Sequence, residues 1–210
     1  PLSNVPAAVR AIRASGTPYV RIAPGDSVNG QLTVRTNDRD ISADMTRYLV
    51  SLGHRRIGFI TGDQKHKAVA NRFLGYQDGL RNAGLKFSQQ LVKSGDNSFR
   101  SGEECTRKLL GGKNPPTAIF AANDDMATGV LRAAHQLGVE VPAALSVAGF
   151  DDIPLAQQIY PALTTIRQPV RKMAEKAAEQ LLEQVRSEPV EQKSAKIEAE
   201  LRIRESTGPV

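Results

Sequence analysis

The sequence has little of what several large protein classes require. Its single cysteine, Cys105, excludes an intramolecular disulfide and a site built from paired thiols, and it fits a packed thiol in a reducing compartment. No stretch approaches the roughly 20 apolar residues of a membrane span. Residues 1–5 have neither the basic nor the apolar region of a signal peptide. We therefore expect a soluble, cytoplasmic protein without a membrane partner.

Signatures of catalysis are missing as well. There is no Gly-x-Ser-x-Gly elbow, phosphate-binding loop or dinucleotide glycine fingerprint. The acid pairs Asp124-Asp125 and Asp151-Asp152 would suit a glycosidase, but adjacent side chains at a helix start point in different directions. His54 follows a glycine at a helix end, where an imidazole commonly meets the terminal carbonyls, and no metal-ligand partners accompany it. We expect no enzyme, no cofactor and no metal ion.

Basic residues outnumber acidic ones, 28 to 22, and the formal net charge is +6. This sign favours anionic partners, but the Lys and Arg residues are scattered through the expected helices and interleaved with Glu and Asp. The pattern therefore predicts a solvated surface and not a nucleic-acid groove.

The hydrophobic pattern alternates between strand-like and helix-like segments. At 210 residues, 40% hydrophobic and 24% charged, the chain can bury one or two ordinary cores. Continuous apolar runs predict buried strands, and apolar residues at helical spacing that end at a glycine predict helices. We expect strands at residues 18–22, 32–34, 57–61, 91–92, 118–121, 145–150 and 163–169, and helices at 5–15, 38–52, 68–83, 101–110, 126–137 and 173–185.

This alternation predicts the α/β class, with parallel sheets flanked by helices on both faces. Near the end of the chain, residues 197–203 alternate apolar and charged side chains. That alternation predicts an edge strand with one face in water.

Polar side chains follow several of the expected strands. An apolar run ends abruptly in Asn123 and Asp124 where an amphipathic helix begins, and this junction is the most informative in the chain. Asp151 and Gln168 follow two other strands, and Arg72 lies near the start of a helix. Ligands of open parallel sheets bind outside the carboxyl ends of the strands, and these residue types hydrogen-bond a polyhydroxylated ligand. The sequence therefore predicts a sugar site.

Each of these residues also has a plain structural interpretation. Asn123 or Asp124 would serve as a cap for the following helix, and Asp151 would cap a helix that starts near Ile153. For Arg72 the alternative is a structural ion pair. These alternatives stay open at this point.

Five motifs occur in order along the chain: GHRRI at residues 53–57, RFLGY at 72–76, PTAIFAAND at 116–124, SVAGFDD at 146–152 and PALTTIRQP at 161–169. Together they resemble, in order and spacing, the LacI/GalR family of bacterial transcription regulators. The resemblance covers almost the whole chain, and it extends to the periplasmic sugar-binding proteins that share the fold.

The resemblance implies a two-lobed core, like a periplasmic binding protein, that closes on a small molecule. Residues 1–36 and 169–195 would belong to the N-terminal lobe, and residues 37–168 and 196–210 would form the C-terminal lobe. The family's helix-turn-helix domain, hinge helix and opening strands have no counterpart in this sequence. We therefore expect a truncated core with an incomplete first lobe and no DNA-binding domain.

The resemblance also assigns residues to effector binding. The arginine would donate to ligand oxygens, the aspartate after Gly-Phe would accept from hydroxyls, and the glutamine would lie at the lobe crossing. Two further positions depart from common family residues, because an asparagine stands where many members place a stacking aromatic ring and a histidine stands where some use arginine. This favours a sugar over a purine. The effector-binding candidates are Arg72, Asn123, Asp151, Gln168, His66 and Asn97.

The implied function is the effector-binding core of a sugar-responsive repressor, in which the ligand changes the angle between the lobes and so controls operator binding. Family members regulate as dimers, and we expect the homodimer contact at residues 126–137 and 152–159. Two alternatives remain. One is a periplasmic sugar-binding protein of a transporter, and the other is a glycosidase-like enzyme.

Overall fold

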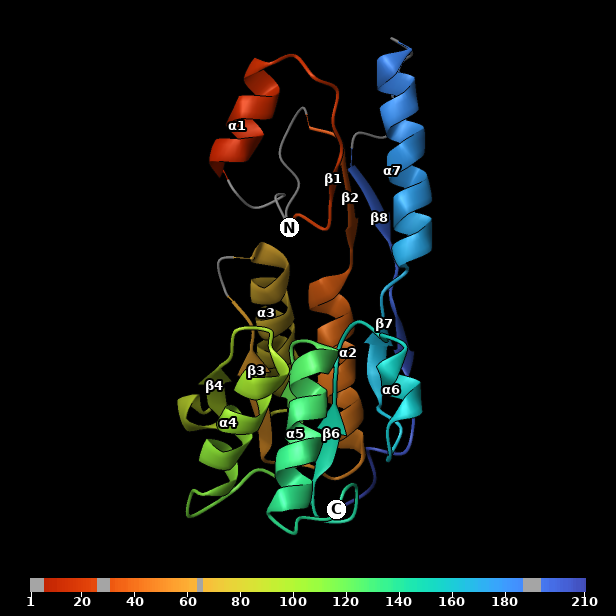
Figure 1. The fold of residues 1–210 in the computed structure, drawn as a ribbon. Coiled ribbons are helices and arrows are strands. Elements are labelled where there is room, and N and C mark those ends of the chain that lie inside the picture. Colours follow the sequence, from red (N-terminus) through yellow and green to blue (C-terminus); the bar gives the residue numbers. More distant parts are fainter. Residues whose placement is uncertain (1–5, 26–30, 64–65, 187–193) are drawn as a thin grey trace.

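The computed structural model of the protein describes residues 6–25, 31–63, 66–186 and 194–210. The chain forms parallel sheets flanked by helices (Figure 1), which confirms the predicted α/β class. No helix within these ranges combines the length and the apolar character that a bilayer crossing demands.

The first sheet is parallel and three-stranded, in the order β1-β2-β8. Helix α7 packs against it, and Met173 and Ala177 of that helix form a small core with Val34 and Ala195 of the sheet. The elements of this part are α1 (Pro6–Ala14), β1 (Arg21–Ile22), β2 (Thr33–Thr36), α7 (Val170–Val185) and β8 (Ser194–Ile197).

The second sheet is parallel and four-stranded, in the order β4-β3-β5-β6. Phe59 and Phe120, from its two central strands, are fully buried and meet edge to face with their ring centroids 5.2 Å apart. The strands are β3 (Ile57–Thr61), β4 (Val92–Ser94), β5 (Ala118–Ala121) and β6 (Ser146–Ala148). Two helix pairs cover the two faces (Figure 1): α2 (Asp38–Ser51) with α3 (Lys67–Asn82), and α4 (Phe99–Leu110) with α5 (Asp124–Gln136). A short 3-10 helix, Gln89–Leu91, precedes β4.

Glycine permits the close approach of α2 and α3. A Cβ atom on Gly75 would lie 2.2 Å from the carbonyl oxygen of Arg39 and 2.7 Å from Cβ of Ser42. Backbone and Cβ atoms cannot move aside like the end of a long side chain. The packing of these helices therefore requires glycine at this position.

Within the described residues, the chain passes three times between the first sheet and the part that holds the second sheet and a two-stranded antiparallel sheet. The first passage is at Asn37, between β2 and α2, and the second is at residues 168–169, between β7 (Thr165–Arg167) and α7. The third is at residues 198–199, between β8 and β9 (Glu200–Arg202). The backbone amide of Ala199 donates to Oδ1 of Asn37 at 2.8 Å, so two of the passages are bonded to each other.

The prediction of one edge strand over residues 197–203 is wrong. Strand β8 ends at Ile197 and belongs to the first sheet, whereas β9 starts at Glu200 and pairs antiparallel with β7. The reason is the passage between sheets, because residues 198–199 connect two strands with different partners. The alternation of apolar and charged residues continues across residues 198–199, so the sequence pattern alone does not reveal that one strand ends and another begins there.

His54 is buried, as a structural residue would be, but its imidazole ring does not bind the carbonyls at the end of its helix. Its Nδ1 lies 2.9 Å from the hydroxyl of Thr117, and its Nε2 lies 2.9 Å from the hydroxyl of Ser146 and 3.1 Å from the carbonyl oxygen of Gly208. The ring therefore joins the second sheet to the C-terminal segment. Burial lowers the pKa of His54.

Candidate functional site

A cavity of about 260 Å³ lies where the end of β1 meets the carboxyl ends of the strands of the second sheet. All six effector-binding candidates line it, so the structure brings together side chains that the sequence separates widely. Apolar side chains complete the wall. The lining residues are Ile22, Ala23, His66, Ala68, Val69, Arg72, Asn97, Asn123, Asp151 and Gln168.

Arg72 lies on the cavity wall and projects from the N-terminal half of α3 toward several acceptors. Its Nε donates to Oδ1 of Asp38 at 3.2 Å, and its Nη1 donates to the carbonyl oxygen of Ala122 at 2.6 Å. Nη1 also lies 3.5 Å from Oδ1 of Asp151, and the guanidinium carbon lies 3.7 Å from the ring centroid of Phe150. The structural ion pair therefore exists, and it orients the same guanidinium toward the cavity.

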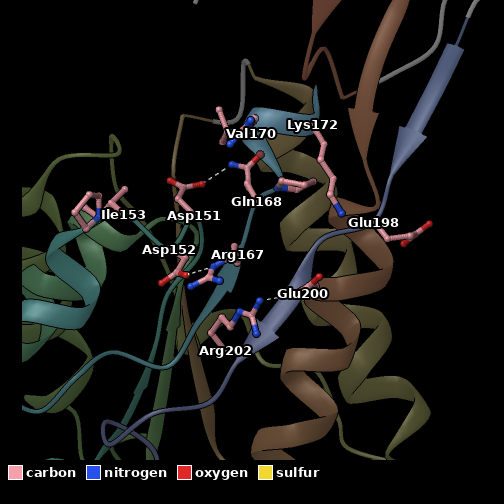
Figure 2. A pocket seen from close by; sticks show the side chains of 13 residues that line it. Asp151, Asp152, Ile153, Arg167, Gln168, Val170, Lys172, Glu198, Glu200 and Arg202 are labelled. Atoms are coloured by element: carbon pink, nitrogen blue, oxygen red, sulfur yellow. Dashed lines mark hydrogen bonds and ion pairs between the residues drawn. The ribbon is translucent and has the colours of Figure 1, made fainter. Parts of the chain in front are cut away.

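Asp151 lies in the turn after β6, and its carboxylate is hydrogen-bonded to another residue of the cavity wall. Nε2 of Gln168 donates to its Oδ1 at 2.6 Å (Figure 2). Burial raises the pKa of Asp151, while the charge of Arg72 and the bond from Gln168 act in the opposite direction. Helix α6 (Leu155–Gln158) starts after Pro154 without a side-chain cap, so the capping interpretation of Asp151 is wrong.

Asn123 caps α5 and reaches the cavity at the same time. Its Oδ1 accepts from the backbone amide of Met126 at 3.0 Å, as the capping interpretation predicts. Its Nδ2 donates to the carbonyl oxygen of Asn97 at 2.9 Å, and Asn97 has a positive φ of 73°. The amide of Asn123 thereby holds the loop that brings Asn97 to the cavity wall.

A second cavity of about 700 Å³ has the hydrogen-bonded pair of Asp151 and Gln168 in its wall (Figure 2). The charged side chains on its wall are largely paired with each other: Arg167 Nε donates to Asp152 Oδ2 at 2.5 Å, and Glu200 accepts from Arg202 at 2.5 Å. Asp151 and Gln168 belong to both cavities.

The described wall of the smaller cavity is rich in hydrogen-bonding groups. Guanidinium and amide groups donate, and carboxylate and amide oxygens accept, which is the combination that hydroxyl groups require. None of the described residues on its wall is Phe, Tyr or Trp. The arrangement suits a ligand with many hydroxyls better than a nucleobase that stacks.

Asp38 is the charged residue of this region that sequence reasoning missed. It is buried and pairs with Arg72, and its Oδ2 accepts from the hydroxyl of Thr36 at 2.8 Å. A signal was present, because Asp38 follows β2 just as Asn123 follows β5. Acidic residues are common in the first turn of a helix, so the sequence offers no reason to distinguish Asp38 from an ordinary helix-start residue.

Comparison with known proteins agrees with the fold. A family model described as the periplasmic binding protein-like domain matches residues 46–207. The sheets, the passages between them and the cavity at the strand ends therefore define a domain of the periplasmic-binding-protein type.

Curated relatives narrow the assignment. The transcriptional repressor CytR of Escherichia coli strain K12 is 38% identical over 175 residues, which are 83% of this chain and 51% of the relative. The transcriptional regulator MalR of Streptomyces coelicolor is 34% identical over 200 residues, which are 93% of this chain and 58% of the relative. The chain spans about half the length of the curated relatives it matches.

Solved structures point the same way. The complex of the regulator CelR with cellobiose has a TM-score of 0.90 at 31% identity, over 95% of this chain and 62% of that one. A LacI-family regulator from Enterococcus faecium with bound ribose has a TM-score of 0.89 at 26% identity, over 98% and 76%. The chain belongs to the LacI family of transcription regulators and corresponds to their effector-binding core.

Proposed function

We propose that this chain senses a sugar on behalf of a transcription repressor. The observation that carries the proposal is the convergence of Arg72, Asn123, Asp151 and Gln168, from four separate segments, on one cavity whose described wall has no Phe, Tyr or Trp. Two similar solved regulators carry cellobiose and ribose, which supports a sugar in this one.

In this proposal each side chain has a defined part. Arg72 donates to ligand oxygens, and Asp151 accepts from hydroxyl groups. Asn123 and Gln168 both donate and accept, and His66 and Asn97 complete the polar wall. A partly buried acceptor such as Asp151 discriminates between ligands, because an analogue that lacks the matching hydroxyl removes one partner of the carboxylate.

Lobe movement would convert binding into regulation. We propose residues 1–36 and 169–195 as one lobe and residues 37–168 and 196–210 as the other. Support comes from the two separate parallel sheets and from a cavity lined from both sides of the passages. The sugar shifts the equilibrium between lobe arrangements only as far as it binds one of them more tightly.

We further propose that the protein acts in the cytoplasm as a homodimer and that it binds operator DNA through a segment outside this chain. Three apolar side chains on and beside α5 and α6 support the predicted dimer contact: Leu137 is 45% exposed, Leu155 is 41% exposed and Tyr160 is 91% exposed. Tyr160 and α5 also line a shared hollow of about 610 Å³. The relatives are named as transcriptional repressors, which favours a regulator over a transporter binding protein and over an enzyme.

Calorimetry with a panel of sugars and nucleobases tests the proposal. We expect one sugar to bind at one site per chain and to be recovered chemically unchanged. Tight binding of a nucleobase without binding of any sugar would overturn the sugar assignment. Turnover of the sugar would support the enzyme alternative.

A further inference from the structure

The turn that carries Asp151 has an unusual backbone. Asp151 has a φ of 123° and Asp152 a φ of 59°. Residues other than glycine rarely adopt such positive φ values unless surrounding contacts hold the backbone there. The two carboxylates diverge (Figure 2). Asp152 accepts from Nε of Arg167 at 2.5 Å and from Nη2 of Arg204 at 2.6 Å, so these arginines anchor one side of the turn.

Asp124 anchors the other side. Its Oδ2 accepts from the backbone amide of Ile153 at 2.9 Å, and its Oδ1 accepts from the hydroxyl of Thr165 at 2.5 Å. The residue is fully buried. A Cβ atom on Gly149 would lie 2.3 Å from Oδ1 of Asp124, so this glycine leaves the space that the carboxylate occupies. One buried carboxylate thus ties the turn to strand β7.

We infer that Asp124 is a positioning residue for the effector-binding carboxylate of Asp151. Asp124 is not on the cavity wall, so it acts through the turn, which it fixes with Asp151 facing Arg72 and Gln168. The inference rests on the proposed function of Asp151 as the acceptor of ligand hydroxyls. Asn123, the preceding residue, lies on the cavity wall, and this dipeptide therefore links that wall to the turn that carries Asp151.

The charge of Asp124 gives this role a measurable signature. Burial raises the pKa of Asp124 to about 6, against the bonds from Thr165 and Ile153, and the charge of Asp151 raises it further. Among the described residues, Asp151 is the charged group that faces Asp124, because Thr165 and the amides of Asp152 and Ile153 are uncharged donors. Protonation of Asp124 should therefore change the electrostatic environment of the Asp151 carboxylate.

Nuclear magnetic resonance of the chain tests the inference without a ligand. The probes are the Nη–H resonances of Arg72 and the side-chain amide of Gln168, because Nη1 of Arg72 and Nε2 of Gln168 both face Asp151. D124A removes both acceptors and is expected to shift these resonances and to make hydrogen exchange at the Ile153 amide roughly tenfold faster. The control is D125A, which removes an exposed carboxylate from the same helical turn.

A conservative variant separates positioning from bulk stability. D124N keeps the shape and one acceptor, so it should restore most of the wild-type resonance positions. It should also abolish the pH dependence that we expect for the Arg72 and Gln168 resonances of the wild-type chain near pH 6. T165V, which removes one of the two donors to Asp124, gives a smaller shift in the same direction and serves if D124A does not fold.

Two results would overturn the inference. One is Arg72 and Gln168 resonances that stay at their wild-type positions in D124A or T165V, and the other is an equal shift in D125A. If the chain binds no sugar but D124A still moves these resonances, Asp124 does position Asp151 and the sugar assignment is the part that fails.

Discussion

Arg72 and Asp38 form an ion pair in which only 9% and 3% of the two side chains are exposed, with Nε 3.2 Å from Oδ1. The pair joins α3 to the start of α2 beside the first passage between the sheets. An exposed pair would contribute little, but a buried carboxylate that loses its partner remains as an uncompensated charge.

Arg72→Ala is therefore expected to lower the free energy of unfolding by about 3 kcal/mol. Denaturant titration followed by circular dichroism measures the change. The matched control is Arg81→Ala, because Arg81 is exposed and pairs with Asp78 on the surface, and this change should stay within roughly 0.5 kcal/mol. Equal losses in the two variants would contradict the structural part assigned to Arg72.

Asp151→Asn should weaken sugar binding by roughly 10- to 100-fold, because the hydroxyl loses a charged acceptor. Calorimetry with the sugar that the panel identifies measures the dissociation constant. Asp125→Asn removes a charge from an exposed neighbouring position and should leave the affinity near the wild-type value. An unchanged affinity in Asp151→Asn would remove this residue from the site.

The stability of the chain should depend on pH through Asp124. Burial raises the pKa of Asp124 to about 6, so the folded chain holds this proton more tightly than the unfolded chain, where the pKa is about 4. Stability from this group is therefore present at low pH and is lost as the pH rises from about 4 to about 6, by roughly 3 kcal/mol. The difference in unfolding free energy between the wild type and Asp124→Asn, measured from pH 4 to 7, isolates this contribution, and a constant difference would refute it.

His54→Ala should destabilise the chain by about 2 kcal/mol, because it removes a buried ring together with its bonds to Thr117 and Ser146. Thermal and denaturant unfolding measure the loss. His135→Ala is the control, since His135 is exposed on α5 and its replacement should have little effect. A neutral His54→Ala would mean that the C-terminal segment is held by other contacts.

Gly75→Ala reverses the sign that helix propensity alone predicts. Alanine in a helix is favoured over glycine by about 1 kcal/mol, but here the new methyl group would meet the backbone of Arg39. We expect a net loss of roughly 1–3 kcal/mol in unfolding free energy. Gly112→Ala, where the nearest neighbour of the added Cβ is 3.7 Å away, should be close to neutral. Stabilisation by Gly75→Ala would show that α2 and α3 can separate without cost.

Much of this architecture follows from the sequence. Helices with a buried stripe and a terminal glycine, such as α3, were predicted to within a few residues because periodicity reports burial directly. Asn123, Asp151 and Gln168 were found because the carboxyl ends of parallel strands meet, which turns residues far apart in sequence into neighbours. His66 and Asn97 came from the family resemblance alone. All six line one cavity, and their part in binding stays a prediction.

The remainder depends on contacts that periodicity does not report. The partners of His54 lie 63 to 154 residues away along the chain, so no local pattern reveals them. The break between Ile197 and Glu200 depends on which strands lie alongside, and Asp124 reads as a helix cap because its bonds to β7 are tertiary. Long-range hydrogen bonds, more than hydrophobic patterning, set these details.

The bond between Asn37 and Ala199 restricts how the two sheets can change their relative angle. A single connecting strand would act as a swivel with many available directions. Two of the three passages are bonded to each other, so the angle between the sheets cannot change by bending one of these two connections alone unless this bond breaks.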